Sequence, residues 1–235
     1  MAWSSVTERM KTGDSGRRLE HTPALDGLRG IAVLLVVLRH LPTVWPRAFE
    51  SWPVVHGLST GGFIGVDVFF VLSGFLITSL LAEAFDDPLG HGRAIRNFYG
   101  RRAIRLLPAL FFLISIFTVV TILDGATLGS LWPSVRSVLL YYNNWHSIWD
   151  SKHFVPDLGH LWSLAIEEQF YIVWPVVLLS VMAFSKKLSV RVVLLLIPIV
   201  WVGWYRSRLW SSGIGWTNIF VRTDARIDAL LIGCV

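Results

Sequence analysis

The chain has 235 residues, and 54% of them belong to the hydrophobic set AVILMFWYC before its 19 glycines are counted. Charged residues make up 16% of the chain, where about 25% is usual in soluble domains. These figures exclude a disordered chain, a collagen, a coiled coil and a disulfide-stapled scaffold, and they predict a membrane protein. We therefore relate the net charge of +5 to membrane topology and expect no nucleic-acid partner.

The first 24 residues form a polar segment that differs from the rest of the chain. Segment 1–24 carries four Lys or Arg residues and no apolar run, so it does not resemble a secretory signal. We expect it to be a flexible cytoplasmic arm preceding a membrane domain at 25–235. The single cysteine, Cys234, allows no internal disulfide bond.

Apolar segments recur along the remainder of the chain at lengths that suit a hydrocarbon core about 30 Å thick, which needs about 20 residues per helix. The expected spans are 25–45, 62–81, 106–123, 161–184, 188–205 and one from about 220 to 235. The last is still apolar at Val235, which predicts that the chain is a fragment of a longer domain. The expected fold class is all-α, a polytopic transmembrane helix bundle with about six spans.

The distribution of Lys and Arg predicts the orientation of these spans, because basic residues accumulate in cytoplasmic loops. With the N-terminus inside, the inner segments 1–24, 86–105 and 185–191 carry four, five and three basic residues, twelve in all. The outer segments carry one, two and two, five in all. This favours a cytoplasmic N-terminus. Segment 132–149 is too interrupted by polar residues to span, so we expect an outer re-entrant or interfacial helix there.

Charges inside a span are costly and usually face a cavity or a partner, which makes them informative. Arg29 and His40 are eleven residues apart on the first span, so they share one helix face and lie roughly 16 Å apart along the axis. Asp26 joins the same face. Arg29 could instead reach the lipid phosphates and pair with Asp26, whereas a histidine at mid-depth has no interface within reach.

The fourth span carries two adjacent carboxylates. His160, Ser163 and Glu167 follow helical spacing on one face, while Glu168 points about 100° away. Two neighbouring carboxylates repel if both are ionised, so we expect one to be protonated or paired with a cation. The alternative for either glutamate is a cap at the outer water interface.

The inner segment before the third span is rich in arginine. Arg101, Arg102 and Arg105 run directly into the apolar helix, and planar guanidinium groups are well suited to binding phosphates. These arginines could equally be topological determinants alone. No metal-ligand spacing, glycine-rich phosphate loop or nucleophile elbow is present, and the charges of 222–228 suggest a structural ion-pair network.

Six ordered motifs resemble acyltransferase family 3, membrane proteins that include glycan O-acetyltransferases. They are LDGLRGIAVLLVVLRH at 25–40, GVDVFFVLSGFLIT at 65–78, FYGRRAIRLLPAL at 98–110, NW at 144–145, HLWSLAIEEQFYIVWP at 160–175 and TDARIDALLIGC at 223–234. The family's domain has about ten helices, so the resemblance also implies that part of it is missing here.

The resemblance implies transfer of an acyl group, usually acetyl, from cytoplasmic acetyl-CoA to a hydroxyl of a glycan or other envelope acceptor. Acetyl-CoA would be a donor substrate, with no permanently bound cofactor. By the same resemblance His40 is the catalytic histidine and Arg29 its motif partner. Arg102 and Arg105 match the family's cytoplasmic arginines, and Glu167 matches its glutamate.

Neutral imidazole suits a general base near neutral pH, so we assign that role to His40 and expect Glu167 to orient it. Two other classes of function stay open on the sequence alone. A multi-pass transporter could use the same charges to line a substrate or proton path, and a non-catalytic scaffold could use them structurally. No internal repeat relates the two halves of the chain, which favours the enzyme over the transporter.

Overall fold

The structure is a computed structural model that describes residues 23–44, 57, 61–85 and 90–235. All regular secondary structure in these ranges is helical, which confirms the predicted all-α class. The helices are α2 (Pro23–Val44), α5 (Ile64–Phe85), α6 (His91–Leu123), α7 (Leu128–Leu139), α8 (Asn143–Trp149), the 3-10 helix η1 (Pro156–Leu161), α9 (Trp162–Phe184), α10 (Leu188–Ser211), α11 (Trp216–Phe220) and α12 (Thr223–Cys234). Most of the predicted arm 1–24 lies outside the described residues.

Four of the described helical segments are long and apolar enough to cross a membrane: α5, α6, η1 with α9, and α10. The chain is therefore a polytopic membrane protein. The span expected at 106–123 is the second half of α6, because residues 91–105, interpreted as a loop, continue the same helix toward the N-terminus. This corrects the sequence interpretation of the arginine segment. The spans expected at 25–45 and 220–235 stay predictions, since α2 carries three charged residues and α12 has only 12 residues.

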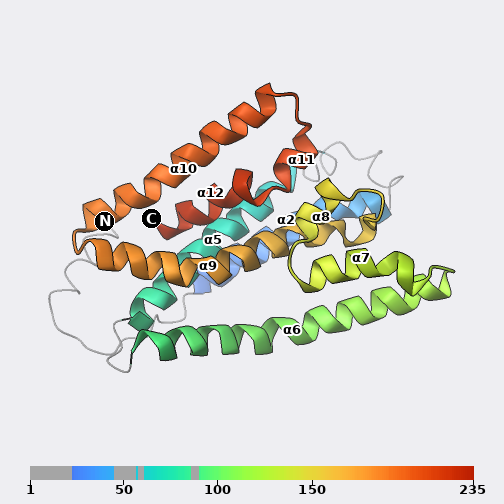
Figure 1. Cartoon of the computed structure of the whole chain (residues 1–235), viewed down its shortest axis with the longest axis horizontal. Helices are drawn as coiled ribbons and strands as arrows, with labels where there is room; N and C mark the ends of the chain where they lie inside the picture. The colour runs from blue at the N-terminus through green and yellow to red at the C-terminus, as the bar shows by residue number, and fades with distance from the viewer. Residues whose placement is uncertain (1–22, 45–56, 58–60, 86–89) are drawn as a thin grey trace.

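Segment 132–149 does not span, as predicted. It forms the end of α7 and all of α8, two short helices joined by a turn in which Tyr141 adopts a positive φ of 53°. Figure 1 shows α7 lying alongside α6 at the edge of the bundle. A capping box between Thr127 and Ser130 begins α7.

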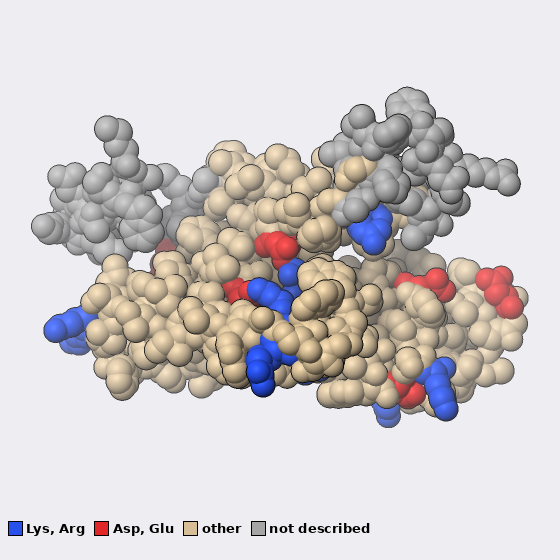
Figure 2. Space-filling view, turned by 90° about the horizontal axis from the view of Figure 1, so that it is seen from above, with Lys and Arg blue, Asp and Glu red and all other residues tan. Residues whose placement is uncertain are grey.

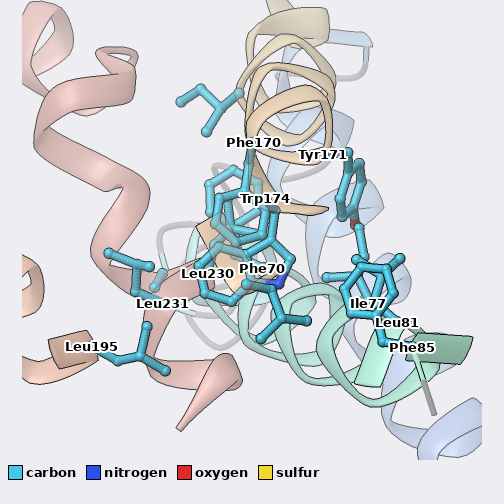
Figure 3. Packing of buried hydrophobic residues seen from close by; sticks show 13 residues of the cluster. Phe70, Ile77, Leu81, Phe85, Phe170, Tyr171, Trp174, Leu195, Leu230 and Leu231 are labelled. Carbon is cyan, nitrogen blue, oxygen red and sulfur yellow. The ribbon is translucent and has the colours of Figure 1, made fainter. Parts of the chain in front are cut away.

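Helix α5 lies at the centre of the bundle and packs against α2, α9 and α12 (Figure 1). Its buried side chains meet those of α9 and α12 in the largest apolar cluster. In Figure 3, Phe70, Trp174 and Leu230 converge from these three helices. The indole N–H of Trp174 donates to Thr78 Oγ1 at 2.8 Å, so the polar edge of this buried ring is satisfied.

Close backbone contact joins α5 to α12. A Cβ atom at Gly74 would overlap the carbonyl of Leu230, and one at Gly233 would overlap the carbonyl of Val71. Small residues that let helix backbones approach are typical of membrane bundles, where apolar burial alone gives little driving force. The two glycines therefore fix the distance between these helices.

Ion pairs between helices provide a second link. Arg226 on α12 pairs with Asp67 on α5, and Asp228 pairs with Arg206 on α10 at 2.9 Å. These contacts confirm the expected structural network, although the partners lie mainly on other helices rather than within 222–228. Figure 2 shows that charged side chains form a few separate groups on an otherwise uncharged face.

Candidate active site

Three cavities follow one another along α2, and each is walled by α2, α5 and the segment of η1 and α9. We call them the arginine cavity, the apolar passage and the histidine cavity, with volumes of about 800, 200 and 760 Å³. The passage shares Val33, Phe69 and Ser163 with the arginine cavity. It shares Val36 and Val66 with the histidine cavity, so the three form a row.

The arginine cavity gathers basic side chains from two helices. Arg29 enters from α2, and Arg101, Arg102 and Arg105 enter from α6. Arg101 and Arg105 are one helical turn apart and exposed. Because residues 91–105 are helical, the α6 arginines project from a fixed scaffold rather than from a loop. The cavity therefore brings four arginines together, three of them from one helix.

Arg102 differs from Arg101 and Arg105 because it is bound to a carboxylate on another helix, whereas Arg29 pairs with Asp26 on its own helix at 3.5 Å, as one of the sequence alternatives expected. The Nε atom of Arg102 donates to Glu168 at 3.0 and 3.2 Å, and its Nη2 contacts the same carboxylate. The guanidinium also stacks on the ring of Tyr171, 3.5 Å from the ring centre. This confirms that one of the two adjacent glutamates is paired with a cation, and it identifies Glu168 as that one.

Glu167 lines the same cavity and is only 6% exposed. Its Oε1 atom has no hydrogen-bond partner among the described residues, which is unusual for a buried carboxyl oxygen. Ser73 and Ser163 line the wall beside it. An unsatisfied carboxyl oxygen therefore lies buried in the wall of this cavity, close to a group of cations.

The histidine cavity brings together His40 from α2 and His160 from η1. Their ring centres are 6.5 Å apart, with the rings edge to face at 76°. Nδ1 of His40 lies 2.8 Å from the carbonyl of Val36, and Nδ1 of His160 lies 2.9 Å from the carbonyl of Asp157. A carbonyl only accepts, so Nδ1 carries the proton in both rings. In each neutral ring Nε2 is then the basic nitrogen.

Aromatic and polar groups complete the histidine cavity. Trp162 and Phe220 pack together with ring centres 4.9 Å apart and line one side of it. The polar side chains that line it are Arg39, His40, Ser147, Asp157, His160, Thr217 and Asn218. Mixed aromatic and hydrogen-bonding walls are typical of small-molecule sites.

A closed set of polar contacts holds α8 and α12 against α9. The side-chain amide of Gln169 donates to Asn144 Oδ1 at 3.0 Å, and Asn144 Nδ2 donates to Thr223 Oγ1 at 2.9 Å. Thr223 Oγ1 in turn donates to Gln169 Oε1 at 2.5 Å. This arrangement gives Asn144, part of the Asn-Trp motif, a structural role that the sequence did not indicate.

The structure separates some of the predicted site residues. Arg29 and His40 lie along one side of α2 as predicted, but they line different cavities, and Glu167 shares its cavity with Arg29 rather than with His40. The recorded ring contact of His40 is with His160, which the sequence placed on the Glu167 face without a role. The described residues contain no group of three or more His, Cys, Asp or Glu that could hold a metal ion.

Comparisons with known proteins identify the family. The acyltransferase domain model of family 3 matches residues 22–231. The provisionally named peptidoglycan O-acetyltransferase YrhL of Bacillus subtilis strain 168 is 37% identical over 91% of this chain and 32% of its own length. Peptidoglycan O-acetyltransferase OatA of Listeria monocytogenes is 33% identical over 92% of this chain and 33% of its own length.

A further relative is the provisionally named O-acetyltransferase SACOL0978 of Staphylococcus aureus strain COL, which is 34% identical over 93% of this chain and 35% of its own length. The chain spans about a third of the length of these relatives. No solved structure gives a significant match. Since the family model covers 210 of 235 residues and includes every wall of the three cavities, the chain belongs to acyltransferase family 3.

Proposed function

We propose that the protein is an integral membrane O-acyltransferase that moves an acetyl group from acetyl-CoA to a hydroxyl of an envelope glycan. The observation that carries this proposal is the row of three cavities along α2. It joins a cationic site to a site with two basic imidazole nitrogens. The names of the relatives, peptidoglycan O-acetyltransferases, support an acetyl donor and a peptidoglycan-type acceptor.

The arginine cavity suits the phosphate groups of CoA. Arg101 and Arg105 are the exposed pair that would bind them, since Arg102 is held by Glu168 and Tyr171. Arg29 would add charge from α2. Glu167 offers an acceptor for the amide N–H groups of the pantetheine arm.

The apolar passage suits the thin pantetheine arm, which would carry the thioester toward His40. Arg29 and His40 are roughly 16 Å apart along α2, so donor phosphates and reacting carbonyl would lie at opposite ends of the row. The acceptor oxygen attacks the thioester carbonyl, the new C–O bond forms and the C–S bond breaks. His40 Nε2 takes the hydroxyl proton and passes it to the departing thiolate.

A transporter is the second candidate, but nothing in the geometry favours it over the enzyme. Four of the charges that a transporter would use are bound in the pairs Arg226–Asp67 and Arg206–Asp228. These pairs link α5, α10 and α12 and line none of the three cavities. Structural pairing accounts for them without a transport path.

The proposal places the protein in the cell membrane with the arginine cavity toward the cytoplasm, as the excess of basic residues at 86–105 and 185–191 favours. Cysteine substitution tests this orientation in a Cys234→Ser background. Ser189→Cys should resist an impermeant maleimide applied from outside, and Ser151→Cys should react. If Ser189→Cys reacted and Ser151→Cys did not, the arginine cavity would face the outside, where no CoA is present, and the proposed orientation would be wrong.

The activity itself is tested on envelope glycans. Cells that carry the full-length gene should contain base-labile acetate on their glycans, and cells lacking the gene should have lost it. Mass spectrometry of the isolated glycans should show the loss of units of acetyl mass. Equal acetylation in both strains would contradict the proposed function.

A further inference from the structure

The second histidine of the histidine cavity has no role in the proton transfer just described. His160 lies at the start of the η1 and α9 segment, and its ring faces that of His40 across 6.5 Å. Both rings line the same cavity of about 760 Å³, which has room for a sugar-sized molecule. One substrate can therefore contact both rings at once.

The hydrogen bond of His160 determines what its other nitrogen can bind. Nδ1 donates to the carbonyl of Asp157 at 2.9 Å, which fixes the ring orientation and leaves Nε2 as an acceptor in the neutral ring. Hence His160 pairs with a substrate group that donates, an O–H or an N–H. It does not suit a carbonyl, carboxylate or phosphate oxygen.

The other groups of the cavity agree with an uncharged, hydrogen-bonding substrate. The titratable or charged side chains that line it are Arg39, His40, Asp157 and His160, a balanced set rather than a cationic one. Trp162 and Phe220 give an apolar surface on which the face of a sugar ring can lie. In the arginine cavity, by contrast, the ring of Tyr171 is already covered by the guanidinium of Arg102.

From these contacts the geometry points to the histidine cavity as the acceptor site, with His160 as its specificity-determining residue. The reacting hydroxyl donates to Nε2 of His40, and a neighbouring O–H or N–H of the same sugar donates to Nε2 of His160. An amino sugar with an acetamido group supplies both kinds of donor. This inference rests on the proposed function, because it assumes that His40 is the base.

The test compares transfer to a sugar with transfer to water in membranes containing the full chain. The acceptor probe is chitotriose, the trimer of N-acetylglucosamine, and release of CoA thiol without sugar measures hydrolysis. His160→Phe should lower transfer to chitotriose about tenfold, the loss of roughly one hydrogen bond. Hydrolysis of acetyl-CoA should be unchanged, because water needs no second contact.

Two variants separate this role from a structural one. His160→Gln retains an acceptor oxygen and should keep more transfer than His160→Phe at the same hydrolysis rate. His153→Phe changes an exposed histidine that contacts Asp150 and lines none of the three cavities, and it should match the wild type. An equal fall of transfer and hydrolysis in both His160 variants would assign His160 to folding alone.

The remaining outcomes are also decisive. Unchanged transfer in His160→Phe would overturn the assignment, and so would wild-type protein that hydrolyses acetyl-CoA but transfers nothing to chitotriose. Failure of the proposed function has a different signature: wild-type protein would release no CoA thiol above the rate of His40→Ala. The two failures are therefore distinguishable in one assay.

Discussion

The arginine cavity and the histidine cavity have almost the same volume but opposite chemistry. The first presents exposed guanidinium groups on α6, and the second presents two imidazole rings whose Nδ1 atoms contact backbone carbonyls, beside an aromatic pair. A phosphate-bearing molecule suits the first cavity and an uncharged, hydroxyl-bearing molecule suits the second. Helix α2 therefore lines two cavities of different chemistry, with Arg29 at one and His40 at the other.

The largest effect should come from the histidine side. His40→Ala removes the proposed base, and general-base catalysis contributes about 10²–10⁴-fold. We expect acetyl transfer to fall by at least about a hundredfold while CoA binding is retained, since His40 does not line the arginine cavity. Release of CoA thiol measures the loss of activity, and CoA affinity in detergent measures whether binding is retained. Retention of a tenth of the activity would exclude a base role of this size.

The second-largest effect should be a loss of CoA affinity when arginines of the arginine cavity are replaced. Replacing both Arg101 and Arg105 by Ala removes two charge-assisted contacts to phosphate, so affinity for CoA should fall about thirtyfold. Affinity for pantetheine, which lacks the nucleotide phosphates, should not change. Calorimetry with the two ligands gives the comparison.

The matched control for that prediction is the double variant of Arg93 and Arg96 to Ala. Arg93 and Arg96 are exposed on the same helix but do not line the cavity. Replacing them therefore removes the same charge without removing a contact to the ligand. If this control weakened CoA as much as the Arg101 and Arg105 variant, net charge rather than the cavity would account for binding. The arginines would then have a topological role only.

A third prediction concerns the apolar passage between the two cavities, which a large side chain should block. Val33 lies where the arginine cavity meets the apolar passage, and Trp at this position would fill the passage. We expect transfer to fall about tenfold while CoA still binds, because the thioester would no longer reach His40. Leu34→Trp is the control, since Leu34 is 63% exposed and lines none of the three cavities. Equal activity in both variants would mean that the donor does not use the passage.

Helical periodicity predicted several of these features correctly. It placed Arg29 and His40 on one side of α2. Repulsion between adjacent carboxylates predicted that one of the two glutamates is protonated or paired with a cation, and Glu168 is paired with Arg102. These results follow from spacing within a single helix, which the sequence states directly. The family resemblance added the expected chemistry, and family membership was confirmed over residues 22–231.

Contacts between helices could not be predicted in the same way. The sequence suggested Glu167 as the neighbour of His40, but in the structure Glu167 lines the cavity of the arginines and His160 lies next to His40. Helix rotation depends on packing such as the Gly74 and Gly233 contacts, whose partners are distant in sequence. Two sequence signals pointed to His160: its position seven residues before Glu167, two helical turns along the same face, and its place at the start of the motif at 160–175.

The smallest predicted effect is a pH dependence of protein stability that arises from His146, next to the histidine cavity. His146 on α8 is 5% exposed, and its ring meets that of Phe154, which lines the cavity, at 5.8 Å. Burial lowers the pKa of His146, and this outweighs the nearby carboxylate of Asp150, which raises it. In the unfolded chain the ring has its ordinary pKa near 6.5.

The sign of the pH effect follows from proton binding. Below about pH 6.5 the unfolded chain binds a proton that the folded protein resists, so the free energy of unfolding falls as the pH falls. Thermal unfolding in detergent at pH 7.5 and 5.5 should show a loss of stability in wild type that is smaller in His146→Phe. His153→Phe, in which an exposed ring is lost, should retain most of the wild-type pH dependence. An identical loss of thermal stability in all three proteins would show that a group other than His146 causes the destabilisation at low pH.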